Sequence, residues 1–444
     1  MNIRVAIPPQ FTQEREYILE VFFRHYLGLS YTVEYLPEGS EPCWIIRMDD
    51  GPEIVVEDHF FSRIPQGRDY REASRIPTTV VRAKLPMTPE EDIPVVYGRP
   101  FLEVGAPSVR CGVDIFSSAF FMLSRWEETV LPDRDDYQRF PGSSSVAYKQ
   151  GFLLRPIVNE YLELLKNMLR SVAPAIQFKK HTFQQRVSCD VDLLRYNHLR
   201  KIAGAIIKYR SFKKLKKSLE NLRRWKNPLE ENMFFIAKLN EGLGQRVEFN
   251  IIPLSTGPHD EPINYRSASK RKLLSQLAER GHLIGFHPGF NTSDNPELFA
   301  QSVARYRQIL ENIHYPFSDV GGRQHFLKWS HEITPQLWEA HGFSYDSTLG
   351  YADRAGFRCG TCWPFPVFDI FRKKTLRLME VPLIVMEYTV IKYENLEYSA
   401  EALSRFFYLK SVTKKYDGVF TFLWHNSHFE TEKDFEFYEA ILKA

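Results

Sequence analysis

The second half of the chain alternates short apolar runs with longer amphipathic ones, and this alternation constrains the fold more than any other feature. Runs with the length and composition of buried strands occur at residues 183–190, 247–254, 282–288, 317–322, 343–349, 378–385 and 419–426. Amphipathic helical patterns separate most of them, as at 270–281, 295–314 and 400–418. Such alternation predicts parallel strands joined by crossover helices, arranged as a barrel or as an open sheet.

The first half has a different pattern. Short strand-like runs separated by Gly, Pro and acidic turns follow an N-terminal strand and a helix at 15–28, and further helical patterns cover 113–128 and 156–171. Only two of the 13 histidines, His25 and His59, precede residue 180. We therefore expect a smaller α/β domain for packing or recognition at residues 1–178, and a second domain with the chemistry at 179–444.

Charge and cysteine content restrict the class of protein. A formal net charge of +3 over 444 residues is too small to indicate a nucleic-acid partner. The N-terminus lacks a signal-peptide pattern, and no run approaches 18 apolar residues. Five cysteines in such a chain favour a reducing compartment, so we expect a cytoplasmic protein. Cys359 and Cys362 are best interpreted as free thiols in a tight turn.

One segment, residues 195–226, is strongly basic, with twelve Lys or Arg and a single acid, Glu220. A solvated helical pair explains it most simply. The alternative is a surface that contacts anionic lipid headgroups or a phosphate-bearing carrier.

Polar residues follow the predicted strands of the second half in a regular way. Because the carboxyl ends of parallel strands meet on one face, we expect these side chains to converge. The residues concerned are Asp190 and Asp192, His287 and Asn291, Arg323 and His325, Asp346, and His425. One carboxylate and two imidazoles can bind a divalent ion, while a second carboxylate acts as base and a further imidazole as acid. The sequence therefore predicts metal-assisted hydrolysis.

The order of these motifs resembles the NodB-type polysaccharide deacetylases over roughly residues 180–430. In that family an early strand ends in a pair of aspartates, matched by "CDVD" at Asp190 and Asp192. The resemblance implies that Asp190 is the catalytic base and that Asp192 binds the metal. A later Arg that supports the base matches Arg323, and a Leu-x-His motif matches His425 as the catalytic acid, with Asp346 as a further site residue.

The second motif of the family, His-x-x-x-His, is altered here. "HPGFN" keeps His287 but has Asn291 where the second imidazole ligand should be. Either His325 supplies the missing nitrogen, or Asn291 coordinates through oxygen, which would favour a harder ion. The resemblance implies a distorted (β/α)7 barrel and a divalent metal, with Zn first and Co, Ni, Mn or Fe as alternatives. The wider pattern is similar to an uncharacterised bacterial branch with an extra N-terminal domain.

The leading hypothesis is a metal-dependent amide hydrolase that deacetylates an N-acetylated sugar in bacterial glycan metabolism. Its substrate would be a carbohydrate, free or linked to a lipid or nucleotide. Two alternatives stay open. A glycosyltransferase could use Asp190 and Asp192 as a metal-binding Asp-x-Asp motif, although this leaves His287, Arg323 and His425 without a task. A catalytically inactive carbohydrate-binding protein would explain the loss of imidazole at Asn291.

Overall fold

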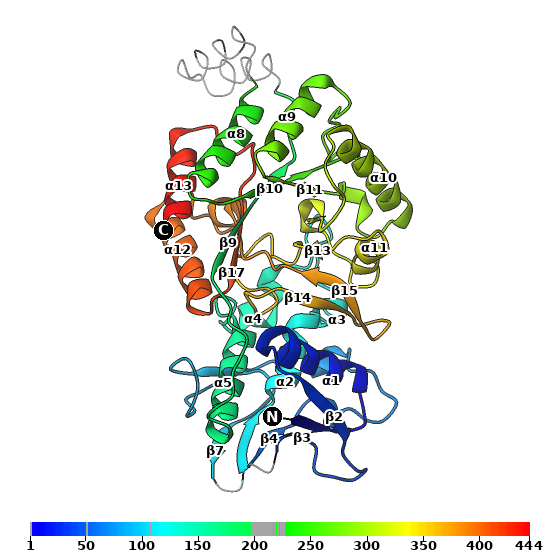
Figure 1. Ribbon diagram of the computed structural model, residues 1–444, viewed down its shortest axis with the longest axis vertical. Coiled ribbons are helices and arrows are strands. Elements are labelled where there is room, and N and C mark those ends of the chain that lie inside the picture. Colours follow the sequence, from blue (N-terminus) through cyan, green and yellow to red (C-terminus); the bar gives the residue numbers. More distant parts are fainter. Residues whose placement is uncertain are drawn as a thin grey trace.

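The computed structural model describes residues 2–49, 52–105, 108–196, 216, 219, 222 and 227–444. The described chain is elongated, with one mixed sheet at its lower end and a larger, mainly parallel sheet above it (Figure 1). The N-terminal part thus lies below the barrel-like part that contains the predicted site, and one hydrophobic core runs through both.

The N-terminal sheet has the order β2-β1-β3-β4-β8-β7 and mixes parallel and antiparallel pairs. Its strands are β1 (Ile3–Ile7), β2 (Tyr31–Tyr35), β3 (Cys43–Met48), β4 (Glu53–Glu57), β7 (Gly98–Val104) and β8 (Ser108–Val113). A separate ribbon pairs β5 (Val81–Ala83) with β6 (Ile93–Val95). The α/β character expected for this region is confirmed, whereas its boundary at residues 178 and 179 stays a prediction.

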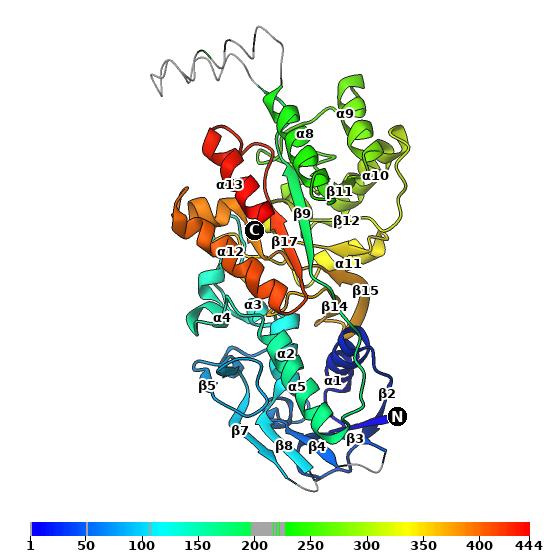
Figure 2. The same ribbon diagram turned by 60° about the vertical axis from the view of Figure 1, so that its left-hand side comes forward.

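The helices of this part cover the sheet and face the barrel. They are α1 (Thr12–Leu19) with its π-helical continuation η1 (Glu20–Leu27), α2 (Ile115–Ser124), α3 (Glu127–Val130), α4 (Val146–Lys149) and α5 (Ile157–Val172). Every residue of α2 is buried, because the helix lies between α5 and the hairpin of the C-terminal sheet, and Asp114 caps its first turn. Figure 2 shows α2 between the lower sheet and the barrel, and the buried apolar side chains of the two parts form one continuous cluster.

The C-terminal sheet has the order β14-β15-β13-β12-β11-β10-β9-β17-β16. Its strands are β9 (Gln184–Val191), β10 (Val247–Ile251), β11 (Leu283–Phe286), β12 (Gly321–Gly322), β13 (Tyr345–Asp346), β14 (Phe365–Asp369), β15 (Lys374–Glu380), β16 (Val385–Met386) and β17 (Val419–Leu423). All neighbours pair in parallel except β14 and β15, which form a hairpin.

The connection between β15 and β16 curves this sheet into a barrel. The two strands lie at opposite ends of the parallel run, yet only residues 381–384 separate them. Four residues span at most about 14 Å, so the sheet must bend until its ends approach each other. The single strand expected at 378–385 is therefore two, since Pro382 lacks the N–H that a continuous ladder needs.

Crossover helices surround the barrel as the alternation predicts. They are α8 (Pro228–Glu241), α9 (Ala268–Glu279), α10 (Pro296–Asn312), α11 (Thr334–Ala340) and α12 (Ala400–Lys415), and α13 (Glu432–Lys443) follows the last strand. The expectation of a distorted barrel of parallel strands and crossover helices, preceded by a smaller α/β part, is confirmed. The distortion lies at the β14–β15 hairpin and at the β15–β16 connection.

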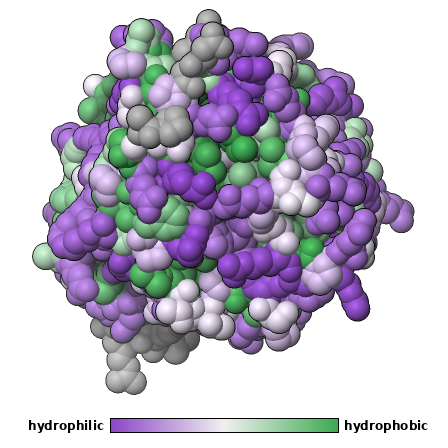
Figure 3. All heavy atoms as spheres, turned by 90° about the horizontal axis from the view of Figure 1, so that it is seen from below, coloured by the Kyte–Doolittle hydropathy of each residue, from purple (hydrophilic) through white to green (hydrophobic). Residues whose placement is uncertain are grey.

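The surface and the cysteines complete the picture. Seen from the N-terminal end, hydrophobic residues are scattered among hydrophilic ones (Figure 3). None of the helices in the described part of the chain is both long and apolar enough to cross a bilayer. All five cysteines are free and buried, so the interpretation of Cys359 and Cys362 as free thiols is confirmed. The basic segment 195–226 lies almost entirely outside the described residues.

Candidate functional site

The predicted site residues lie at the carboxyl ends of the parallel strands, on one face of the barrel. Asp190 is the penultimate residue of β9 and Asp192 follows the strand directly, while His287 directly follows β11. Arg323 follows β12, and His425 comes two residues after β17. The structure therefore brings together side chains that are up to 235 residues apart in the chain, as strand-end geometry requires.

Asp190 is buried and held by two donors. Its Oδ1 accepts hydrogen bonds from Asn250 Nδ2 at 2.8 Å and from Arg323 Nη1 at 2.9 Å. Gly285 makes the first possible, because a Cβ at that position would stand 1.9 Å from the side-chain oxygen of Asn250. Arg323 is itself fixed by Ser188 Oγ and by Ser347. The second oxygen of Asp190 stays available, with His287 Nε2 at 3.8 Å.

Three imidazoles present the same nitrogen to Asp192. The Nε2 atoms of His287 and His325 lie 3.3 and 3.6 Å from Oδ1, and that of His425 lies 3.6 Å from Oδ2. In each ring the other nitrogen contacts an acceptor: the Arg323 carbonyl at 2.5 Å, Asp260 Oδ1 at 2.7 Å and Glu387 Oε1 at 2.5 Å, respectively. With Nδ1–H donating, a neutral ring directs its Nε2 lone pair at the carboxylate.

This arrangement needs a positive charge at its centre, because lone pairs and a carboxylate otherwise repel each other. Asp192 Oδ1 is buried and makes no hydrogen bond of acceptable geometry, despite its two imidazole neighbours. A tetrahedral ion with bonds of about 2.0–2.1 Å separates its ligand atoms by about 3.3 Å, close to the spacings found here. Asp192, His287 and His325 thus fit a divalent transition metal, and the Asp192 side chain, 28% exposed, leaves an open side.

The electrostatics agree with a cation-binding cluster. Burial alone would lower the pKa of His325, but Asp192 and Asp260 outweigh it and raise that pKa to about 9. Burial would raise the pKa of Asp192, yet His325 and His425 hold it well below its ordinary value. Protons therefore occupy the cluster in the absence of a metal, and a bound metal would displace them.

His425 belongs to a second, adjoining group. Burial lowers its pKa, but Glu387 and then Asp192 raise it to about 10. Glu387 is fully buried, and its Oε1 also contacts His428 Nδ1 at 2.7 Å. The ligand-type atoms of Glu387, His425 and His428 lie within 4.8 Å of one another. Glu387 therefore orients His425 and keeps it protonated at neutral pH.

Two predicted site residues lie elsewhere. The amide of Asn291 donates to the Thr256 carbonyl at 2.8 Å, so Asn291 braces the loop that contains Asp260, and it does not line the pocket. Asp346 is buried against Thr348 and Glu380 and does not line the pocket either. His325 lies in one group of ligand-type atoms with Asp192 and His287, so its place is compatible with the alternative in which it supplies the missing imidazole, which stays a prediction.

Three residues that contact the site were not anticipated. Asn250 lies within β10, Glu387 directly follows β16, and Asp260 lies in the loop after β10. The strand-end position of Glu387 was a usable signal, because "VMEY" follows an apolar run. Asp260 gave no such signal, since eight residues separate it from the end of β10.

The cluster opens into a cavity of about 250 Å³. Its aromatic and apolar wall is formed by Tyr137, Phe326, Leu327, Met386, Tyr388, Tyr393 and Leu423. Tyr137 and Arg139 reach it from the N-terminal part of the chain.

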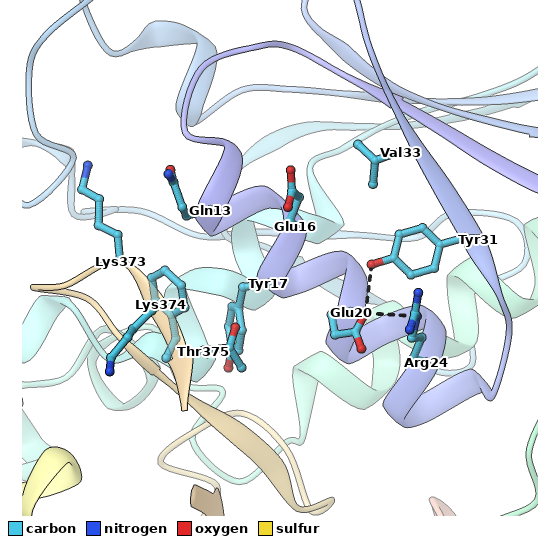
Figure 4. A pocket seen from close by; sticks show the side chains of 11 residues that line it. Gln13, Glu16, Tyr17, Glu20, Arg24, Tyr31, Val33, Lys373, Lys374 and Thr375 are labelled. Atoms are coloured by element: carbon cyan, nitrogen blue, oxygen red, sulfur yellow. Dashed lines mark hydrogen bonds and ion pairs between the residues drawn. The ribbon is translucent and has the colours of Figure 1, made fainter. Parts of the chain in front are cut away.

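A second cavity, of about 500 Å³, lies between α1 with η1 and the β14–β15 hairpin (Figure 4). Its lining mixes Glu16 and Glu20 with Arg24, Lys373 and Lys374 and contains no histidine or cysteine among the described residues. It therefore offers no comparable ligand set.

Comparisons with known proteins concern different stretches of the chain. The model of a Family of unknown function (DUF7033) matches residues 3–174. No curated protein matches the chain.

Three crystal structures resemble it over about 60% of its length. A protein from Mycobacterium smegmatis assigned as a polysaccharide deacetylase has 14% identity and a TM-score of 0.40, with 60% of this chain and 84% of that one covered. Puue allantoinase has 11% identity and a TM-score of 0.37, with 59% and 84% covered. A protein from Pseudomonas aeruginosa PAO1 assigned as a polysaccharide deacetylase has 12% and 0.36, with 59% and 84% covered. The likeness concerns the fold of the barrel, and in that fold the chain resembles the polysaccharide deacetylases and an allantoinase.

Proposed function

We propose that this chain is a metal-dependent hydrolase that removes the acetyl group from an N-acetylated sugar. One observation carries the proposal: an Asp-His-His cluster of metal-ligand spacing lies beside a separate buried carboxylate, Asp190, and a separately held imidazole, His425. Hydrolysis of an amide needs these three functions, namely an electrophilic centre, a base for water and an acid for the leaving nitrogen.

The metal would be held by Asp192, His287 and His325, and when bound it would polarise the acetyl carbonyl and the attacking water. Asp190 is the group placed to accept the proton from that water. Its Oδ1 is committed to Asn250 and Arg323, so Oδ2 faces the cluster. Arg323 and Asn250 therefore keep the base in one orientation.

His425 is placed to donate a proton to the departing amine from the other side of Asp192. Its Nε2 points toward the cluster, and its Nδ1 is bound to Glu387. Because its pKa is raised to about 10, the ring is protonated at neutral pH and can act as an acid. The proposed base and acid are thus held by different partners, Asp190 by Arg323 and Asn250 and His425 by Glu387.

The shape of the cavity supports a sugar as the substrate. Tyr388 and Tyr393 line the cavity and are 38% and 39% exposed, so their ring faces are accessible to a ligand. They lie edge to face with 5.5 Å between ring centroids, and Tyr388 stacks on His428. Flat aromatic faces beside a few polar groups are suited to a pyranose ring. Free buried thiols are consistent with a cytoplasmic substrate, such as a lipid- or nucleotide-linked precursor.

The glycosyltransferase alternative fits the same residues less well. An Asp-x-Asp motif would need both carboxylates at a metal bound to a nucleotide diphosphate. Oδ1 of Asp190 already accepts hydrogen bonds from Arg323 and Asn250. The groups beside Asp192 Oδ1 are the imidazoles of His287 and His325. An inactive binding protein would have no reason to keep a base and an acid on separate supports.

The test is release of acetate from a panel of N-acetylated monosaccharides and nucleotide-linked sugars by the Zn²⁺- or Co²⁺-loaded protein. We expect metal-dependent release that falls by about 10²–10⁴-fold in Asp190→Asn, the cost of losing a general base. Metal content measured on the same variant should stay at the wild-type level. A protein that binds metal but releases no acetate from any member of the panel would contradict the proposal.

A further inference from the structure

The turn that presents His325 is conformationally strained. Phe326 and Leu327, which follow it directly, have φ values of 62° and 56°, in the left-handed region that residues with a side chain rarely adopt. Two such residues in succession persist only where neighbouring contacts hold them. The turn carries a predicted metal ligand, so those contacts bear on the site.

The strongest of these contacts comes from outside the barrel. Arg139, in the loop between α3 and α4, donates from Nη1 to the Phe326 carbonyl at 2.9 Å. The Tyr137 ring packs on Phe326 with 4.8 Å between centroids. Within the barrel, the rings of Phe290 and His259 pack on Phe326 at 5.1 and 5.4 Å.

Arg139 is itself rigidly placed. It is 8% exposed, and its Nε donates to Asp135 Oδ2 at 2.7 Å. Asp135 also accepts the backbone N–H groups of Tyr137 and Arg139 through Oδ1. The other end of the guanidinium, Nη2, donates to the Tyr393 hydroxyl at 3.1 Å. One side chain therefore joins its own loop, the His325 turn and the aromatic wall of the cavity.

The loop that carries Arg139 is anchored to the barrel on both sides. Before it, Glu128 binds Arg358 and His331. After it, the backbone N–H groups of Gly142 and Ser143 donate to Asp353. α3 and α4 lie between the lower sheet and the barrel, where these contacts form (Figure 1). The position of Arg139 is thus fixed relative to the barrel and does not depend on the N-terminal sheet alone.

We propose that Arg139 is a positioning residue through which the N-terminal part of the chain completes the active site: its bond to the Phe326 carbonyl holds the His325 turn, and its bond to Tyr393 holds the cavity wall. The inference rests on the proposed metal site and extends it. It gives the N-terminal part a task beyond packing, because the ligand geometry of His325 depends on a residue some 190 positions earlier in the chain.

The test compares Arg139→Ala and Arg139→Lys with Arg134→Ala in the full chain. Arg134 is a matched control from the same loop, since its guanidinium binds the carbonyls of Leu131, Asp133 and Glu128 and not the turn. Zn²⁺ affinity is measured by competition with a chelator. We expect Arg139→Ala to lower it by about 10–100-fold, as for other groups that orient a ligand. Arg139→Lys should restore part of the loss, because an ammonium can reach one carbonyl but cannot also bind Tyr393.

A second readout needs no metal. The amide of Leu327 is bonded to the Gln324 carbonyl at 3.0 Å, so its hydrogen exchange reports on the turn in the metal-free protein. We expect exchange there to be at least about tenfold faster in Arg139→Ala and unchanged in Arg134→Ala.

Tyr393→Phe, which removes only the hydroxyl, should leave Zn²⁺ affinity unchanged and raise the KM for the sugar.

The outcomes separate the two proposals. Unchanged exchange at Leu327 and unchanged Zn²⁺ affinity in folded Arg139→Ala would overturn the role of Arg139 and leave the metal site intact. If the wild-type chain binds no Zn²⁺, the proposed hydrolase fails, and exchange at Leu327 still decides whether Arg139 holds the turn. Should Arg139→Ala not fold, the same measurements on Arg139→Lys decide the matter.

Discussion

The candidate metal-binding cluster (Asp192, His287 and His325, with His425 beside it) and the charge network between the two parts of the molecule are both largely buried, yet they are built in opposite ways. In the network, formed by Arg125, Glu127, Glu128, His331, Tyr351 and Arg358, the charged groups are matched. Glu128 alone accepts from Arg125, Arg358 and His331, and none of its oxygens lacks a partner. In the cluster, Asp192 Oδ1 has no hydrogen bond and three Nε2 atoms converge on its carboxylate.

The difference shows which buried charges indicate function. A network whose donors and acceptors are all paired stabilises one geometry and has no capacity left for a ligand. A carboxylate faced by three imidazole nitrogens needs positive charge there, which a metal would supply and which protons on the imidazoles supply without one. Burial and charge are common to both regions, so the unmatched acceptors of the cluster are the feature that distinguishes a site from a support.

The largest expected effect comes from breaking the network. Glu128→Ala leaves Arg125 and Arg358 buried without their common partner, which should lower the free energy of unfolding by about 3–5 kcal/mol. Asp192→Asn in the cluster should cost less, because His325 and His425 can release their protons when the carboxylate charge is lost. Urea unfolding of the metal-free variants measures both. Equal losses in the two variants would remove the distinction drawn here.

A smaller effect concerns Asp346 and Glu380, a pair of acidic side chains that is buried like the network and the cluster. Burial, followed by the neighbouring carboxyl, raises the pKa of Glu380 well above its ordinary value, and burial raises that of Asp346 to about 6. The folded chain therefore binds extra protons above the unfolded pKa near 4, up to about pH 6 at Asp346 and to higher pH at Glu380. Stability should fall as pH rises through that range, because the unfolded chain has already released these protons.

The control for this pair is Glu380→Gln, which keeps the shape and removes one of the two titrating groups. Because the neutral amide no longer repels Asp346, the pH dependence of the unfolding free energy between pH 4 and 7 should become shallower. A slope identical to that of the wild type would show that the pair does not share a proton.

The smallest effect sharpens the description of the cluster itself. Asp260→Asn keeps an acceptor for His325 Nδ1 but removes its charge, so Zn²⁺ affinity should fall by about 10–100-fold. Asp369→Asn is the matched control: it is equally buried, but it binds the backbone N–H groups of Phe371 and Arg372. Chelator competition compares the two. A similar loss in both would mean that Asp260 acts through the fold and not through His325.

The sequence predicted those parts of the site that depend on strand ends. Asp190, Asp192, His287, Arg323 and His425 converge because each lies at or within two residues of a strand terminus, where position in space follows from position in the chain. The alternation of strands and helices likewise indicated the barrel. The hydrophobic period of each segment and the alternation of strands and helices along the chain can both be recognised in a single sequence.

The remainder depends on contacts that no local pattern encodes. Asp260 reaches His325 from an irregular loop, and Asn291 was given a ligand role by its spacing alone, whereas its amide binds Thr256. Arg139 could not have been found, since its partners lie in another part of the chain and its turn has no motif. Pro382 was the one available sign that the run at 378–385 is not a single strand.

The four residues between β15 and β16 have a consequence for the diversity that this architecture permits. Ser347 and Thr421 hold the strap from either side by donating to the carbonyls of Val381 and Pro382. Because residues 381–384 and not a hydrogen-bonded ladder join β15 to β16, the length of this connection limits how far the two ends of the sheet can separate. Insertion of a residue in this connection should let β15 and β16 move apart and make room for a bulkier ligand. Asp192, His287 and His325 follow interior strands, so their mutual spacing should stay the same.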